Sequence, residues 1–220
     1  MDGEPVRARQ LKCVGAMVLL LKDAINPNLV QTLEGQPVFV HGFPFANVAH
    51  GNNSLLATKY ALKLADVVVT EGGFATDLGA EKFFDIVAPQ TGFRPEVAVL
   101  VASVRALHHH GGAGKNGLAD PDLKALKKGF ANLDKHVENL RKFGLPVVVA
   151  INRFPTDSPA ELEALRCHCE EDLGVAAAVS EVVAHGGEGG LALAESVLAH
   201  IGRSKFHSLF PLDLPVREKL

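Results

Sequence analysis

The sequence has little net charge and no long hydrophobic run. Its 220 residues include 22 basic and 25 acidic side chains, which gives a formal net charge of −3. So small a charge creates no global basic field, and we expect neither a nucleic-acid partner nor a membrane partner. The longest strongly apolar run, residues 14–21, is far too short to span a bilayer. The polar first ten residues lack an apolar core of the signal-peptide kind, so no secretory signal is visible.

Cysteine is also scarce. The chain has only Cys13, Cys167 and Cys169, an odd number with two of them close together, so no disulfide framework is expected. We therefore predict a reducing, cytoplasmic location. The triplet Cys167-His168-Cys169 could suggest a metal site, but on a helix these side chains point to different faces, and no second ligand pair stands at zinc-site spacing. A helix with one or two half-buried thiols is the favoured interpretation, and no metal site is predicted.

A phosphate-binding loop is missing as well. A Walker A motif requires GxxxxGK[ST], and Gly114-Lys115 is the place to test for it. The first glycine of the motif is His109 here, and the final Ser or Thr is Asn116, so the motif is absent. The histidine run 108–110 is interpreted as a solvated loop rather than as a functional metal site.

What is present favours an α/β fold. Hydrophobic residues make up 47% of the chain, which is enough for one large domain, or one and a fraction. Short apolar runs that are rich in valine and do not alternate are typical of parallel strands covered on both faces. They occur at 37–41, 66–70, 97–103, 146–151 and 176–180.

Helical patterns separate these predicted strands. The pattern at 53–65 has an apolar face and is capped by Asn53 or Ser54, and Asp120-Pro121 is expected to begin a helix that ends before Gly144. Its apolar stripe comprises Leu123, Leu126, Phe130, Leu133, Val137 and Leu140. A capping box at 158–161 opens a helix to about residue 172, and 191–201 forms the last one. The run 14–21 is left open as helix or strand. Alternating strands and helices predict a mostly parallel sheet with helices on both faces.

Glycines and polar groups follow several of these strands. The segments 41–54 and 70–85 each lie between a strand and a helix, where an open α/β sheet holds ligands. Histidines and asparagines in the first, and Glu71-Gly72-Gly73-Phe74 in the second, suit an anion bound by backbone N–H groups. We expect Asp77 to cap the helix after the second segment. The alternative is a pair of plain structural turns.

Two later segments have the same placement. Asn152 to Asp157 follows a strand and sets Arg153 beside Phe154, a pair that suits a flat, anionic ligand. Alternatively, Phe154 simply packs under its loop. The glycine-rich loop 186–190 could form an anion nest, although such loops are common.

Seven segments in order resemble formate–tetrahydrofolate ligase. They are KDAINPNLVQTLEG, VFVHGFPFANVAHGNNSLLATKYALKLADVVVTEGGF, DLGAEKFFDI, VRALHHHGG, GFANLDKHVENLRKFGLPVVVAINRFPTD, SEVVAHGGEGG and PLDLPV. The resemblance implies a fragment of a P-loop NTPase-like ligase core. It also implies a cytoplasmic homo-oligomer that couples cleavage of ATP, bound with Mg²⁺, to joining formate and tetrahydrofolate. The reaction passes through formyl phosphate and yields 10-formyltetrahydrofolate.

The resemblance also implies site residues. Those expected in the formyl-transfer region are His41, His50 and Phe74. Those expected to bind the folate are Phe154 and Arg153. Those expected to contact phosphate or another anion are Asn47, Gly73, Gly187 and Gly189.

The chain departs from the family pattern at several points. The family's HGGPF is His41-Gly42-Phe43-Pro44-Phe45 here. A tryptophan that forms one wall of the family's pterin site is Val183, while the other wall, Phe154, is kept. Losing one aromatic face removes about 1 kcal/mol of stacking.

The resemblance covers the middle to later part of the family's chain, after its ATP-binding lysine loop and a catalytic arginine. We therefore expect residues 1–205 to form a partial ligase-like domain and residues 206–220 to pack on further protein. The first hypothesis is a piece of a ligase, either a fragment of a longer product or one subunit of a split enzyme, which needs the missing phosphate-loop segment for chemistry. The second is a non-catalytic truncated paralogue that binds folate weakly or pairs with a full-length ligase. In both cases we expect the isolated chain to be inactive.

Overall fold

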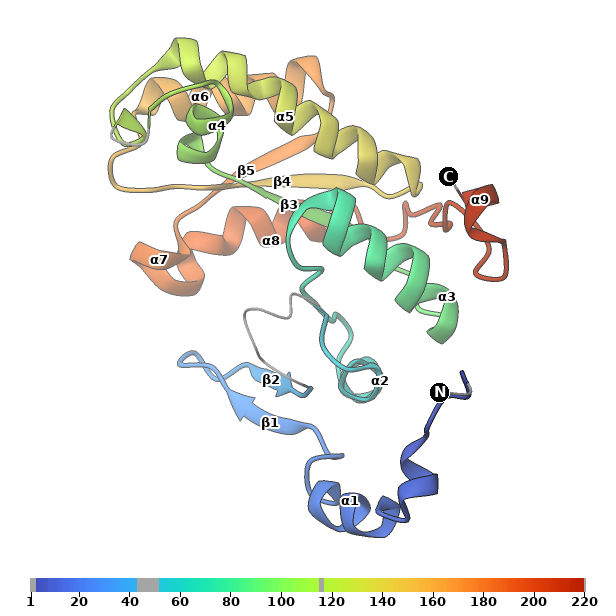
Figure 1. Cartoon of the computed structure of the whole chain (residues 1–220). Helices are drawn as coiled ribbons and strands as arrows, with labels where there is room; N and C mark the ends of the chain where they lie inside the picture. The colour runs from blue at the N-terminus through green and yellow to red at the C-terminus, as the bar shows by residue number, and fades with distance from the viewer. Residues whose placement is uncertain (1–2, 43–51, 115–116, 220) are drawn as a thin grey trace. The chain divides into compact units, whose positions relative to one another are not determined.

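The chain divides into two units. The computed structural model describes residues 3–42, 52–114 and 117–219. Its contacts separate an N-terminal unit, Met1–Glu71, from a C-terminal unit, Gly72–Leu220. Figure 1 labels the helices and strands of both units.

The N-terminal unit is built from short elements with little core. A 3₁₀ turn at Ala8–Leu11 and helix α1 (Val14–Leu21) precede an antiparallel hairpin of β1 (Asn28–Gln31) and β2 (Pro37–Val40). Helix α2 (Leu55–Leu64) follows, and the Ser54 side chain caps it by accepting the Ala57 N–H. Among the described residues of this unit, Ala57 alone is buried.

Two of the five strand predictions are corrected by this unit. The predicted strand 37–41 forms as β2, but it pairs antiparallel with β1 instead of joining a parallel sheet. A turn containing Gly35, with φ 89°, brings the two strands together. The predicted strand 66–70 does not form, and Val67 and Val69 lie exposed. A valine-rich segment becomes a strand only where a neighbour can accept its backbone hydrogen bonds.

The C-terminal unit contains a parallel sheet in the order β3 (Ala98–Ala102), β4 (Val147–Asn152) and β5 (Ala176–Ser180). Figure 1 shows α5 (Leu123–Lys142) and α6 (Pro159–Cys167) over one face and α8 (Leu191–Leu198) over the other. The remaining helical elements are Ala75–Ala80, Lys82–Val87, α3 (Ala88–Thr91), α4 (Val104–His110), His168–Asp172, α7 (Val182–His185), Gly186–Gly190 and α9 (Val216–Lys219). The predicted class, α/β with a parallel sheet between helices, is confirmed.

Helix α5 provides much of the core, as its apolar spacing predicts. Leu126, Leu133 and Val137 are fully buried in the cluster that includes the central strand β4. The predicted start at Asp120-Pro121 is wrong, because α5 begins at Leu123. The Asp122 carboxylate accepts the N–H groups of Lys124 and Ala125 and so fixes the first turn.

Helix α4 packs closely on α5 because Gly129 carries no side chain. A Cβ added at Gly129 would overlap the backbone carbonyl of Leu107. This contact places the whole of α4, and with it the histidine run 108–110. That run is the end of a helix and not the solvated loop that was predicted, since Ser103 caps α4 and Val104, Leu107 and His108 are buried.

The helix predicted at 191–201 as the last one ends earlier, at Leu198, and α9 follows it. Most of the other element predictions are confirmed. The capping box forms, with Ser158 accepting the Glu161 N–H at 3.3 Å and Glu161 accepting from Ser158 in return. Cys167 is half-buried and Cys169 is buried, which confirms the interpretation of that triplet. The run 14–21 is helical. Asp77 does not cap its helix, because the helical run already begins at Ala75.

The start of the C-terminal segment packs on the core of its own unit. Lys205 donates its N–H to the carbonyl of Gly144 at 2.9 Å, and the Phe206 ring lies 5.6 Å from that of Phe84. Whether the rest of residues 206–220 packs on further protein stays a prediction.

Candidate functional site

The carboxyl ends of β3, β4 and β5 meet along one edge of the sheet. Ala102 pairs with Ile151 and Asn152 pairs with Ser180, so the three strands end at the same level. Side chains that follow the strands therefore gather at one edge, which is where open α/β sheets bind ligands.

Phe154 follows β4 in a tight turn. Its N–H donates to the Asp157 carboxylate at 2.8 Å, and the Asp157 N–H donates back to the Phe154 carbonyl at 3.0 Å. Asp157 is buried, so this turn is well anchored. The ring itself is half-buried and does not pack wholly beneath the loop.

Arg105, from the first turn of α4, covers one face of the Phe154 ring. Its guanidinium carbon lies 4.4 Å from the ring centroid, and its Nη2 donates to the Thr156 hydroxyl at 3.0 Å. Sequence reasoning missed this residue. The signal that could have found it is its position directly after β3, the same rule that selected Phe154 after β4.

Arg153 points to a carboxylate instead of to Phe154. Its Nη1 lies 2.6 Å from Oε1 of Glu181, which follows β5. The Arg153 N–H also donates to the Ser180 carbonyl at 3.1 Å, which joins the ends of β4 and β5. Both side chains are more than a third exposed, so the ion pair contributes little stability. The Glu181 carboxylate does compensate much of the positive charge that Arg153 would otherwise offer to an anionic ligand.

The glycine-rich segment Gly186–Gly190 approaches the same edge as a 3₁₀ turn. The Glu181 N–H donates to the Gly189 carbonyl at 2.9 Å, and a Cβ on Gly189 would collide with the Glu181 backbone. A packing requirement therefore explains this glycine. Anion contacts by Gly187 and Gly189 stay a prediction. Val183, in the adjoining α7, is 88% exposed.

A buried polar network lies behind this edge. His108 Nε2 lies 2.8 Å from a carboxylate oxygen of Glu161, and His108 Nδ1 lies 3.2 Å from the Leu118 carbonyl. Glu161 also accepts the Asp122 N–H at 2.7 Å and the Ser158 hydroxyl at 2.7 Å. Burial alone raises the pKa of Glu161, but the hydrogen bonds from Ser158, Asp122 and His108 outweigh it and hold the pKa below the ordinary value.

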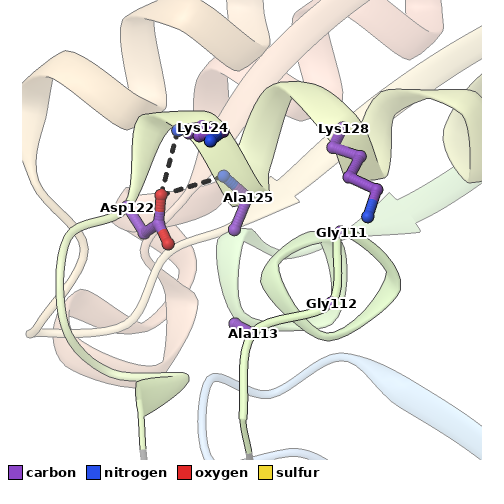
Figure 2. Close-up of a pocket in the computed structure, with 7 residues that line it drawn as sticks. All are labelled: Gly111, Gly112, Ala113, Asp122, Lys124, Ala125 and Lys128. Carbon is purple, nitrogen blue, oxygen red and sulfur yellow. Dashed lines mark hydrogen bonds between the residues drawn. The ribbon is translucent and has the colours of Figure 1, made fainter.

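An open hollow lies at the start of α5, beside this network. Figure 2 shows its lining, with Lys124 and Lys128 on α5 and the chain turn 111–113 below them. One oxygen of Asp122 is engaged by the helix N–H groups. None of the predicted site residues lines this hollow.

The remaining predicted residues lie elsewhere. Phe74 is 71% exposed. Gly73 adopts a φ of 90° in the same turn. The neighbouring Thr76 binds His136 of α5 at 2.7 Å, which ties the turn to α5 rather than to the edge of the sheet.

His41 belongs to the N-terminal unit, where both ring nitrogens are engaged. Nδ1 lies 2.6 Å from the Ser54 hydroxyl, and Nε2 lies 2.8 Å from the Ala24 carbonyl. His50 and Asn47 fall outside the described residues. The roles predicted for all three stay predictions.

Metal clusters and membrane helices do not occur among the described residues, and the thiol of Cys169 is unreactive. No group of three His, Cys, Asp or Glu side chains in 3–42, 52–114 and 117–219 could hold a metal ion. Over the same residues no helix has the length and hydrophobicity needed to cross a membrane. Burial, with Glu170 and Asp134 nearby, raises the pKa of the Cys169 thiol to about 12, so it stays protonated and unreactive at neutral pH.

Together the fold and the edge define an α/β domain that places an aromatic ring and two arginines at the carboxyl ends of parallel strands. A comparison with protein families agrees with this class and gives it a name. The family model for formate–tetrahydrofolate ligase matches residues 1–220, the whole chain. The chain belongs to the formate–tetrahydrofolate ligase family, whose activity is the ligation of formate to tetrahydrofolate.

Proposed function

We propose that this chain supplies the folate-binding part of an ATP-dependent formate–tetrahydrofolate ligase that makes 10-formyltetrahydrofolate through formyl phosphate. The family match over the whole chain carries this proposal. The Phe154 turn supports it, because a half-buried ring at the carboxyl edge of a sheet offers a flat apolar surface to a pterin.

The proposal gives each predicted site residue a part. Phe154 stacks on the pterin, and Arg153, held by Glu181, shapes the same edge. Gly73, Gly187 and Gly189 offer close backbone approach to an anionic group. His41, His50 and Phe74 line the region of formyl transfer, and Asn47 contacts the phosphate.

The phosphoryl-transfer step requires charge stabilisation that this chain does not provide from a Walker loop. Its sequence contains no GxxxxGK[ST], and no described cluster is suited to Mg²⁺. Transferring a phosphoryl group depends mostly on positioning and on neutralising phosphate charge. We therefore assign ATP, Mg²⁺ and the phosphate loop to protein outside these 220 residues, either elsewhere in a longer product or on a second subunit. The isolated chain is then inactive.

The assembly is proposed to be an oligomer in the cytoplasm. The three free cysteines fit a reducing compartment. The apolar side chains of α1, such as Val18, Leu19 and Leu20, are more than half exposed, which fits a surface completed by another chain.

The alternative is a non-catalytic paralogue that binds folate weakly or pairs with a full-length ligase. Val183 favours it, since this exposed aliphatic side chain offers no ring to a pterin. In this alternative, the chain has an assembly role, in which it pairs with a full-length ligase and does not itself catalyse the ligation.

Calorimetric titration of the purified chain tests the proposal. We expect binding of tetrahydrofolate and no binding of ATP. Phe154→Leu should weaken folate binding by about five- to tenfold, because a leucine cannot stack. The matched control is Phe93→Leu, a half-buried phenylalanine that precedes β3 at the opposite edge of the sheet. Binding of ATP would refute the assignment of the phosphate site to protein outside these 220 residues, and no binding of either ligand would favour the assembly role.

A further inference from the structure

Arg105 lies at the carboxyl edge of the sheet, and among the described residues its charge has no carboxylate partner. Arg153, on the turn after β4, is neutralised by Glu181 at 2.6 Å. No ion pair joins Arg105 to a carboxylate within residues 3–42, 52–114 and 117–219. Its side-chain hydrogen bond goes to a neutral hydroxyl, that of Thr156. Its Nε is buried and has no partner at all.

An arginine held in this way requires an explanation. A buried N–H of a charged group without a partner is costly, and arginines are usually paired when they are partly buried. Packing of the guanidinium over the Phe154 ring at 4.4 Å compensates part of that cost. The rest is unexplained unless a ligand completes the surroundings of this side chain.

The stacking of Arg105 on Phe154 also changes the surface that is open to a flat ligand. One face of Phe154 is covered by the guanidinium, which is itself planar and stacks readily on electron-rich rings. Arg105 is half-buried, so part of it reaches the solvent at the edge of the sheet. The outer surface of the Phe154 wall therefore includes a flat cation.

We propose that Arg105 is a ligand-binding residue, and that its guanidinium forms a second stacking surface, beside Phe154, for an electron-rich heterocycle. This inference rests on the proposed function, which makes that heterocycle the pterin of tetrahydrofolate. Thr156 is the positioning residue, because its hydroxyl accepts a hydrogen bond from the guanidinium at 3.0 Å.

Calorimetry with Arg105→Lys tests the stacking role. Lysine keeps the charge but lacks the plane, so we expect about five- to tenfold weaker binding of tetrahydrofolate. Tetrahydropterin, which lacks the aminobenzoyl-glutamate, should lose the same factor, because the stacked part is the pterin. Arg166→Lys is the matched control, since Arg166 lies on the outer surface of α6 and pairs with Glu163 at 2.6 Å. It should bind both probes like the wild type.

A double-mutant cycle distinguishes stacking from a structural role. If Arg105 and Phe154 act as one wall, the double variant Arg105→Lys, Phe154→Leu should bind no more weakly than the weaker single variant. Should Arg105→Lys fail to fold, Thr156→Val serves instead. It keeps the arginine, removes its hydrogen bond and should weaken binding about two- to threefold.

The outcomes separate this inference from the proposed function. Wild-type binding with an unchanged Arg105→Lys variant overturns the role of Arg105 alone. Loss of tetrahydrofolate binding with tetrahydropterin binding unchanged would place Arg105 on the glutamate end and also overturn the stacking role. No wild-type binding of either probe overturns both proposals.

Discussion

Glu161 shows how a buried carboxylate can stay charged. Its side chain is 1% exposed, yet it accepts hydrogen bonds from His108, Asp122 and Ser158. These partners come from α4, from the start of α5 and from the start of α6. One carboxylate thus joins three segments behind the ligand edge.

We predict that Glu161→Gln destabilises the protein by about 2–3 kcal/mol at pH 7, because an amide cannot accept from all these donors. The folded pKa of Glu161 lies below the ordinary value of 4.5, so its contribution is complete above about pH 4.5 and is lost as the pH falls through the folded pKa. Urea unfolding of both proteins between pH 7 and pH 3 should show the difference shrinking with acidification.

Glu163→Gln is the control for this prediction. Glu163 lies on the same helix, but its carboxylate is exposed and pairs with Arg166. Its replacement should change stability little. A difference for Glu161→Gln that is equally large at pH 7 and pH 3 would show that the carboxylate charge is not what matters.

At the scale of elements, the crossing of α4 and α5 positions Arg105. Gly129 allows the close approach, since its missing side chain leaves room for the Leu107 carbonyl. Glycine within a helix ordinarily costs about 0.5–1 kcal/mol relative to alanine. Packing must therefore justify this glycine.

We predict that Gly129→Ala destabilises the protein by about 1–3 kcal/mol, the reverse of the usual effect in a helix, because the added methyl group forces α4 away from α5. Chemical denaturation measures the change. Lys127→Ala, at an exposed position of the same helix, should stay within about 0.5 kcal/mol of the wild type. A stabilising Gly129→Ala would show that α4 can shift without cost.

At the scale of the whole molecule, the two units differ in how much core they have. The C-terminal unit has a continuous cluster from Phe84 to Val175, whereas the described N-terminal residues bury Ala57 alone. A unit with so little buried apolar surface is only marginally stable by itself. We therefore expect further protein to stabilise the N-terminal unit more than the C-terminal unit.

We predict that the purified chain forms no 10-formyltetrahydrofolate from ATP, formate and tetrahydrofolate, because no Walker loop is present to neutralise the phosphate charge. Adding a separately produced family segment that carries GxxxxGK[ST] should restore turnover. The Phe154→Leu variant in the same mixture should be slower at limiting folate. Product formed by the chain alone would refute the prediction. No turnover in the mixture, together with co-elution with a full-length ligase, would favour the assembly role.

The sequence by itself determined features that depend on local spacing and on composition. The stripe of α5 and the capping box at Ser158 formed as predicted, because helix periodicity and caps are properties of neighbouring residues. The strands β3, β4 and β5 were identified because their short, valine-rich apolar runs are also a local property of the sequence. Phe154 was selected by its place after a strand. The family was already visible in ordered segments of sequence.

Only the tertiary structure decided which residues meet. The strand predicted at 66–70 failed because pairing requires a neighbour that local sequence does not reveal, and β2 found its partner in a hairpin. The histidine run lies at the end of a helix, and its first member, His108, is buried and contacts Glu161, 53 residues away in the sequence. Arg153 is the neighbour of Phe154 in the sequence, but in the fold it pairs with Glu181. The cation over the Phe154 ring is Arg105, which precedes Phe154 by 49 positions. Contacts between residues far apart in sequence depend on how helices pack, and spacing along the chain does not encode that.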